Sequence, residues 1–234
     1  MTTEPTRVLL IAAHPDDTEF SSGGTVAEWV RQGREVHYLV CTRGDKGSAD
    51  PEMLPERLMK IREAEQRAAA KVLGVNQVEF LSFRDGELAP TLELRGEIVH
   101  AIRRIRPDVV LTHDPATLYS EDFVNHPDHR AVGQAALDAI YPTARDRLQF
   151  PEHLAEGLEP HKVKEVYLWG SLRPNHWVDI SPSFERKIQA LVKHESQIAD
   201  PSGIQKRMRE RAGTLGQPHG IDYAEAFFRI VMAR

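Results

Sequence analysis

The sequence has little of what marks secreted, membrane-spanning or nucleic-acid-binding proteins. Its 234 residues include a single cysteine, Cys41, which excludes an intramolecular disulfide and a cysteine-rich zinc knuckle. One thiol is typical of a reducing compartment, so we expect a cytoplasmic protein. No stretch approaches the roughly 20 apolar residues that a membrane-spanning helix needs. The polar start of the chain, "MTTEPTR", does not resemble a signal peptide.

An excess of positive charge is also missing. The formal net charge is −5 at pH 7, whereas a nucleic-acid-binding domain usually carries a basic face. We therefore expect no nucleic-acid partner. What is present, 41% hydrophobic and 28% charged residues, is enough for one sizeable core. We expect a single domain over residues 1–234.

Strand-like and helix-like segments alternate along most of the chain. The strand-like runs are short and largely apolar, as expected of strands covered on both faces. The helix-like segments carry apolar residues at helical spacing. This alternation predicts an α/β fold, a Rossmann-like three-layer αβα sandwich with a mostly parallel sheet. The expected strands are 7–13, 35–42, 77–81, 108–113 and 165–171, and the expected helices are 21–32, 56–73, 91–106 and 127–140.

The C-terminal third of the chain is less regular. Residues 142–162 are rich in proline and histidine and could be an insertion. A helix is expected over roughly 182–198. The basic segment 203–213 is open to three interpretations, which are a solvated helix face, an oligomer contact and a mobile lid.

Titratable residues gather where the predicted parallel strands end. His14, Asp16 and Asp17 follow the first strand, and His113 follows the fourth. In an open parallel sheet, ligands bind beyond the carboxyl ends of the strands. A second cluster, "NHPDHR", opens the helix at 127–140. Two clusters that are distant in sequence should therefore meet at one rim of the sheet.

This combination of side chains suits a metal site. Two imidazoles and one carboxylate are a common zinc set that leaves a position open for hydrolysis, and they would also accept iron(II) or cobalt. Of two adjacent aspartates, one can bind the metal while the other takes a proton from water. Each motif alone has a plainer explanation, because strand-end histidines usually lie on the surface and Asp pairs often cap helices. Their coincidence at one rim favours the metal site.

Two segments carry a family resemblance. The segment "AHPDD" at residues 13–17 and the segment "HPDH" at residues 126–129 resemble the motifs of the LmbE-like (PIG-L) family of zinc-dependent N-acetylglucosaminyl deacetylases. The resemblance also includes "RGDKG", "REAEQRAAAKVLGV" and "FRDGEL". It implies a Zn2+-dependent hydrolase that cleaves the N-acetyl bond of a small amino-sugar or glycoconjugate substrate. Acetate and a free amine would be the products, and a homo-oligomer would be plausible.

The resemblance also implies a role for each residue of the two motifs and for two residues between them. The implied metal ligands are His14, Asp17 and His129, and the implied base is Asp16. His126, oriented by Asp128, is implied to stabilise the oxyanion or protonate the leaving amine. The implied sugar contacts are Arg62 and Asp85.

One departure from the family pattern and two alternatives remain. Many relatives carry a glutamate directly after the two aspartates, whereas this chain has Thr18 there and Glu19 one position later. The change leaves the implied ligands intact but alters the turn beneath them. The sequence also fits an amidase acting on a thiol–sugar or natural-product conjugate, or a non-catalytic sugar- or nucleotide-binding module of Rossmann-like fold.

Overall fold

A seven-stranded sheet forms the middle layer of residues 6–232, the part of the chain that the computed structural model describes. The strand order is β3-β2-β1-β4-β5-β7-β6. Strands β1 to β5 run parallel, and β7 pairs antiparallel with both β5 and β6. The strands are β1 (Arg7–Ala12), β2 (Glu35–Thr42), β3 (Gln77–Phe83), β4 (Val109–His113), β5 (Glu165–Trp169), β6 (His176–Asp179) and β7 (Ala224–Val231).

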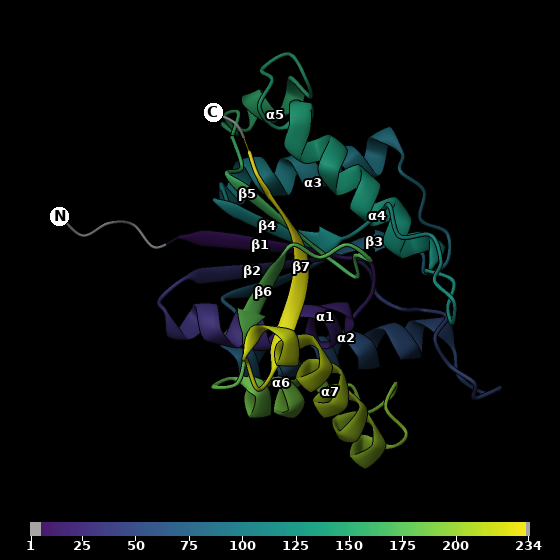
Figure 1. Cartoon of the computed structure of the whole chain (residues 1–234). Helices are drawn as coiled ribbons and strands as arrows, with labels where there is room; N and C mark the ends of the chain where they lie inside the picture. Colours follow the sequence, from purple (N-terminus) through teal and green to yellow (C-terminus); the bar gives the residue numbers. More distant parts are fainter. Residues whose placement is uncertain (1–5, 233–234) are drawn as a thin grey trace.

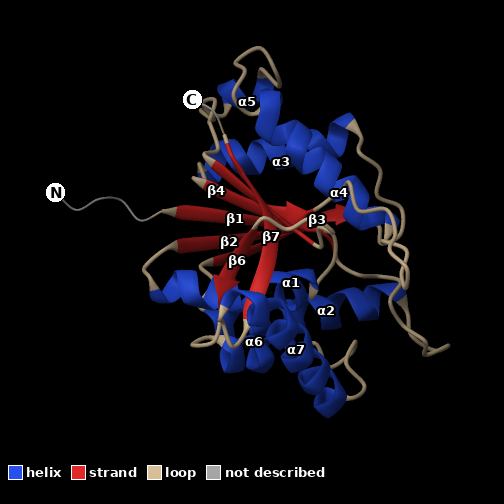
Figure 2. Ribbon diagram, in the orientation of Figure 1, coloured by secondary structure: helices blue, strands red, loops and turns tan. Residues whose placement is uncertain are grey.

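Helices cover both faces of this sheet (Figure 1, Figure 2). Helices α3, α4 and α5 lie on one face, and α1, α2, α6 and α7 lie on the other. No helix within residues 6–232 is long and apolar enough to cross a membrane. The helices are α1 (Asp17–Arg31), α2 (Pro55–Leu73), α3 (Leu92–Ile105), α4 (Pro127–Asp138), α5 (Glu152–Ala155), α6 (Phe184–Leu191) and α7 (Pro201–Gly216), with a π-helical turn at Ala139–Thr143 and a 3₁₀ turn at Gln217–His219.

The apolar run of β1 explains why two layers of helices are needed. Successive side chains of a strand point to opposite faces. Leu9 and Ile11 join the core beneath α3 and α4, whereas Val8 and Leu10 join the core beneath α1 and α2. All four are fully buried, so β1 is an interior strand covered by helices on both faces.

The order in which strands are added to the sheet reverses between β1 and β4, and this reversal positions the functional rim. Strand β2 pairs with one side of β1 and β4 with the other, with Ala12 opposite Val40 and Ile11 opposite Thr112. The chain leaves the two strands toward opposite faces, and such a switch point opens a crevice at the carboxyl ends. The residues that follow β1 and those that end β4 therefore lie side by side.

The predicted αβα sandwich is confirmed, since the five predicted strands correspond to β1–β5 and the four predicted helices to α1–α4. Helix α1, however, begins at Asp17, four residues before the predicted start at residue 21. The amides of Glu19 and Phe20 already bond to the carbonyl of Asp16. The buried residues of this first turn, Asp17, Thr18 and Glu19, are polar, so hydrophobic periodicity does not reveal the turn.

The C-terminal third differs most from the prediction. It adds β6 and β7 to the sheet, and α6 ends at Leu191, well before the end of the predicted helix at 182–198. The basic segment 203–213 lies within α7, where Ile204, Met208 and Ala212 form one buried face. Its charged residues therefore cover the outside of a packed helix.

The stretch 142–162 is fastened to α3 by one buried arginine. Arg103 is 1% exposed, and its guanidinium donates only to backbone carbonyls of this stretch within the described chain. The five donors of a guanidinium form a rigid fork that suits several acceptors at once. The acceptors are the carbonyl oxygens of Thr143, Ala144, Asp146, Gln149 and Phe150.

A buried ion pair joins the C-terminal strand to the helices beneath the sheet. The Lys187 ammonium lies 2.5 Å from the Glu225 carboxylate, and both side chains are at most 5% exposed. Glu225 also accepts hydrogen bonds from the amides of Gly24 and Thr25. A Cβ on Gly24 would lie 2.7 Å from Ile180, so this close approach of α1 requires glycine. The pair thus ties α1, α6 and β7 together.

Replacing Lys187 with methionine should lower the free energy of unfolding by about 3–5 kcal/mol, because Glu225 would stay buried without its cation. Urea denaturation followed by circular dichroism measures this loss. Arg186→Met, on the exposed side of the same helix, is the matched control and should change stability by no more than about 0.5 kcal/mol. Equal losses in the two variants would contradict a stabilising role for the ion pair.

Candidate metal and catalytic site

The turn between β1 and α1 carries the first motif in a strained conformation. Asp16 has φ 95° and ψ −27°, in the left-handed region. This region costs a residue with a Cβ atom about 1–2 kcal/mol. Two side chains of α2 hold the turn, since the Asp16 amide donates to Gln66 Oε1 at 2.8 Å and Arg62 donates to the Pro15 carbonyl at 2.8 Å.

Asp17 is the point where three imidazoles meet. Its Oδ1 lies 3.1 Å from His129 Nε2, and its Oδ2 lies 3.2 Å from His113 Nε2. The same Oδ2 accepts the His14 amide at 2.7 Å and lies 3.6 Å from His14 Nδ1. Burial alone would raise the pKa of this carboxyl, but His129 and His113 hold the pKa well below its usual range. Asp17 is therefore an ionised carboxylate surrounded by imidazole nitrogens.

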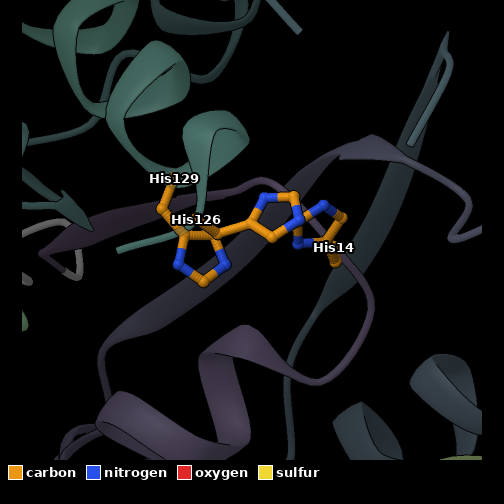
Figure 3. A group of neighbouring side chains, drawn as sticks. All are labelled: His14, His126 and His129. Atoms are coloured by element: carbon orange, nitrogen blue, oxygen red, sulfur yellow. The ribbon is translucent and has the colours of Figure 1, made fainter. Parts of the chain in front are cut away.

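The three predicted metal ligands, His14, Asp17 and His129, come together at this point. His14 lies in the turn after β1, and His126 and His129 come from the start of α4 (Figure 3). One nitrogen from each of His14, His126 and His129 lies within 4.8 Å of the other two. The set Asp17, His113 and His129 meets the same limit. Neutral imidazole and carboxylate are the donors that zinc prefers, so the residues at this rim fit a divalent cation.

The Asp128 carboxylate contacts a different histidine from the one predicted. We expected it to orient His126, but its Oδ2 lies 3.1 Å from His14 Nε2. The carboxylate also accepts the amides of Gly86, at 2.7 Å, and Leu88, at 3.2 Å. The first turn of α4 directs this buried side chain inward to β1, whereas His126 caps the helix and accepts the Asp128 amide at 3.2 Å. The carboxylate of Asp128 therefore meets His14, and its backbone amide meets His126.

His14 consequently has two carboxylates on one nitrogen. Asp85 Oδ1 lies 3.2 Å from Nε2, close to the contact made by Asp128. Burial lowers the pKa of His14, but the hydrogen bonds of Asp128 and Asp85 outweigh it and raise the pKa to about 10. A carboxylate on one ring nitrogen orients a metal-bound histidine and raises its basicity. The arrangement leaves Nδ1, on the side of Asp17, as the nitrogen for a metal.

Asp16 stands apart from the imidazoles and faces α2. Its Oδ2 lies 3.2 Å from Arg62, whose other terminal nitrogen lies 3.9 Å from Asp85. Burial, followed by the charge of Asp17, raises the pKa of Asp16 to about 7 despite the opposing charge of Arg62. The two residues expected to contact substrate, Arg62 and Asp85, thus lie against the expected base and the first histidine.

His113 is a site residue to which the sequence analysis gave no role. The indole N–H of Trp169 donates to its Nδ1 at 3.0 Å. Since an indole nitrogen can only donate, the ring proton must sit on Nε2. The protonated Nε2 then donates to the Asp17 carboxylate at 3.2 Å and cannot accept from the Ala13 amide, which lies 3.3 Å from the same nitrogen. The signal in the sequence was the position of His113 at the end of β4.

A cleft of about 410 Å³ opens over this cluster. Its floor contains Asp17, His113 and His129, and Trp169 forms part of its wall. Helix α7 contributes Arg211, which belongs to the basic segment 203–213. The loop that follows β4 contributes Asp114, Asp122, Phe123 and Asn125, and Ser21 and Gly170 complete the lining.

The chain is similar to known proteins over most of its length. Residues 9–140 match the sequence family described as PIG-L, GlcNAc-PI de-N-acetylase. The chain is 37% identical over 223 residues to a diacetylchitobiose deacetylase of Thermococcus kodakarensis, with 94% of this chain and 81% of that protein covered. It is 28% identical over 270 residues to a mycothiol S-conjugate amidase of Streptomyces coelicolor, with 98% and 87% covered.

Solved structures share the same architecture. The N,N'-diacetylchitobiose deacetylase from Pyrococcus horikoshii superposes with a TM-score of 0.90 at 31% identity, with 97% of this chain and 85% of that chain covered. The 4-carboxy-2-hydroxymuconate hydratase GalB of Pseudomonas putida KT2440 superposes with a TM-score of 0.81 at 22% identity, with 98% of each chain covered. The second likeness is one of fold alone.

The His113 ring should stay neutral, with its proton on Nε2, from about pH 5 to about pH 8. Burial lowers its pKa to about 4, so the neutral form predominates from about pH 5 upward. Ring ¹⁵N shifts of the metal-free protein measure both properties. In Trp169→Phe the tautomer with the proton on Nδ1 should gain population. A proton on Nδ1 in the unaltered protein, or a charged ring at about pH 6, would contradict this assignment.

Proposed function

Because this chain belongs to the PIG-L family of de-N-acetylases, we propose that it is a metal-dependent hydrolase that cleaves the N-acetyl bond of an amino sugar or glycoconjugate. Membership confirms the family resemblance of the "AHPDD" and "HPDH" segments. The products are acetate and a free amine. The observation that carries the proposal is the pairing of a carboxylate bound by imidazoles, Asp17, with an adjacent carboxylate, Asp16, that lies outside the imidazole cluster.

His14, Asp17 and His129 would hold the cation, which we take to be zinc. Two imidazoles and a carboxylate support zinc over magnesium or calcium, which prefer oxygen donors; iron(II) is the main competitor. A bound divalent cation polarises the acetyl carbonyl and makes a water more acidic. The carboxylate of Asp128 on His14 supports this assignment, because ligating histidines usually donate their other N–H to such a group.

Asp16 would act as the general base. Its carboxylate takes the proton of the attacking water, and the guanidinium of Arg62 keeps it oriented. The pKa of about 7 puts Asp16 near the value at which a base works best at neutral pH. The neighbouring Arg62 and Asp85 would then contact the sugar or its acetyl group at the edge of the same turn.

His126 would stabilise the oxyanion. Its Nδ1 accepts the Asp128 amide, so a neutral ring carries its proton on Nε2. Burial lowers the pKa of His126, which supports a neutral donor rather than a charged acid. A preorganised N–H directed at the oxygen where charge develops is an effective form of electrostatic catalysis. Asp128 contributes through its backbone amide, which fixes this tautomer.

Two alternatives concern the substrate and the chemistry. The likeness to a mycothiol S-conjugate amidase supports an amidase acting on a thiol–sugar conjugate as the second candidate. A non-catalytic binding module is disfavoured by the free carboxylate beside the metal-ligand cluster. The proposal treats residues 1–234 as one deacetylase domain, of which 1–5 and 233–234 lie outside the described residues.

The single thiol supports a cellular location, and exposed apolar side chains support self-association. We place it in the cytoplasm, where the free and buried Cys41 needs no partner. A homo-oligomer is supported by exposed apolar side chains beside the cleft, in the loop after β4. These are Leu118, Tyr119, Phe123 and Val124.

Purified protein should release amine from N-acetylglucosamine, its oligomers or thiol-linked N-acetylglucosaminides, as measured with a fluorogenic amine reagent. Asp16→Asn keeps the shape of the side chain but removes the base, so kcat should fall by about 100-fold or more. Metal content, measured by elemental analysis, should stay at the level of the unaltered protein. Near-normal turnover by Asp16→Asn with metal bound would show that Asp16 is not the base.

Replacing His129 with alanine should abolish stoichiometric metal binding and activity together, since it removes one of three protein ligands. His100→Ala, on α3 and away from the cleft, is the control and should retain both. Elemental analysis after dialysis, combined with the amine assay, measures the two effects. Full zinc content in His129→Ala would overturn the ligand assignment.

A further inference from the structure

We propose that Gln66, itself fixed by Glu19 and His194, is the positioning residue that keeps Asp16 in its left-handed conformation and so directs the carboxylate of the base. The inference rests on the proposed function of Asp16. Gln66, Glu19 and His194 are all fully buried, with 0% of their surface exposed. They come from α2, from α1 and from the turn after α6.

The hydrogen bonds of Gln66 allow only one orientation of its amide. Its Nε2 donates to both carboxylate oxygens of Glu19 at 3.0 Å. Its Oε1 therefore faces the amide N–H of Asp16, at 2.8 Å. A flipped amide would set two donors against each other at Asp16 and an oxygen against the carboxylate of Glu19. Glu19 thus fixes the amide so that Oε1 of Gln66, rather than Nε2, faces the strained turn.

Glu19 is in turn held from two sides. The hydroxyl of Thr18 donates to its Oε2 at 2.8 Å, and His194 Nε2 lies 3.2 Å from the same oxygen. A buried carboxylate is stable only where donors surround it. The displaced glutamate of the first motif therefore has a partner from the C-terminal third of the chain. This links the turn after α6 to the turn that carries Asp16.

The network acts on the base without acting on the metal ligands. The His14 amide fixes Asp17 directly, at 2.7 Å, and Gln66 takes no part in that bond. Within the described residues, the Asp16 amide N–H donates its only hydrogen bond to Gln66 Oε1. Without it, the amide N–H would be buried and unpaired, and the peptide could rotate toward negative φ. The Asp16 carboxylate would then turn away from its place beside Arg62.

The first test is Gln66→Leu, which keeps the volume of the side chain and removes the acceptor. We expect kcat to fall between about 10- and 100-fold, because a small misplacement of a catalytic group has an effect of this size. KM should change by less than about 2-fold and metal content should be unchanged, because neither sugar contacts nor ligands are altered. Leu73→Ala, fully buried on the same helix, should lower Tm while kcat stays unchanged.

The second test exchanges the two partners. Gln66→Glu alone sets two carboxylates against each other and should lower kcat as Gln66→Leu does. The double variant Glu19→Gln with Gln66→Glu rebuilds the pattern, because the new amide donates to residue 66 and accepts from His194. Its kcat should return to within about 3-fold of the unaltered enzyme, a recovery that loss of packing would not give. A double variant as slow as Gln66→Glu, or parallel loss of metal and kcat in Gln66→Leu, would overturn the proposal.

A measurement independent of turnover separates this inference from the proposed function. Hydrogen exchange of the Asp16 amide should be slow in the unaltered protein and fast in Gln66→Leu. If the unaltered protein releases amine from no acetylated sugar, the proposed function fails while the exchange result still reports on Gln66. Equal exchange rates in the two proteins would refute the role of Gln66 whatever the activity.

Discussion

Two adjacent carboxylates can share this buried turn only because their surroundings separate them. Asp17 is surrounded by imidazole nitrogens and a backbone amide, which stabilise its charge. Asp16 is paired with one guanidinium, but burial and the charge of Asp17 outweigh it and the weaker opposing charges of His194 and His14, so the pKa values of the two carboxyl groups move in opposite directions. Such divergence assigns different tasks to chemically identical side chains. The remaining elements serve to deliver these partners: α2 brings Arg62, β4 brings His113 and α4 brings His129.

Helix α2 has a larger part in the site than its sequence suggests. Arg62 and Gln66 are four residues apart, so they lie on the same face one turn from each other. Together they hold the carbonyl of Pro15 and the amide and carboxylate of Asp16. The groups that would do chemistry are thus supported by helices and strand ends, which hold geometry better than loops do. The loop after β4 and Arg211 of α7 line the cleft but do not support the Asp16 turn, and a bound substrate would lie against them.

The sequence predicted the elements whose signals are local. Short apolar runs separated by amphipathic helices indicate a parallel sheet, and the carboxyl ends of neighbouring strands must meet, so the meeting of the two clusters at one rim followed. The choice of His14, Asp17 and His129 came from the family resemblance. The contact of Asp128 with His14 depends on the direction in which α4 enters the rim, which the spacing of "HPDH" does not contain. Gln66 lies in a polar helix and reads as a solvated residue. Only tertiary packing shows that its neighbours are a buried carboxylate and a strained turn.

The position of β7 between β5 and β6 has a consequence for synthesis on the ribosome. In the described sheet, β6 pairs with β7 alone, and the outer edge of β5 stays open until residues 224–231 are available. Strands β5 and β6, which emerge earlier, therefore wait for one that emerges late, and an open strand edge invites pairing with other chains. A nascent or truncated chain that lacks this strand would expose that edge to chaperones, even though every residue of the candidate metal site has already been translated.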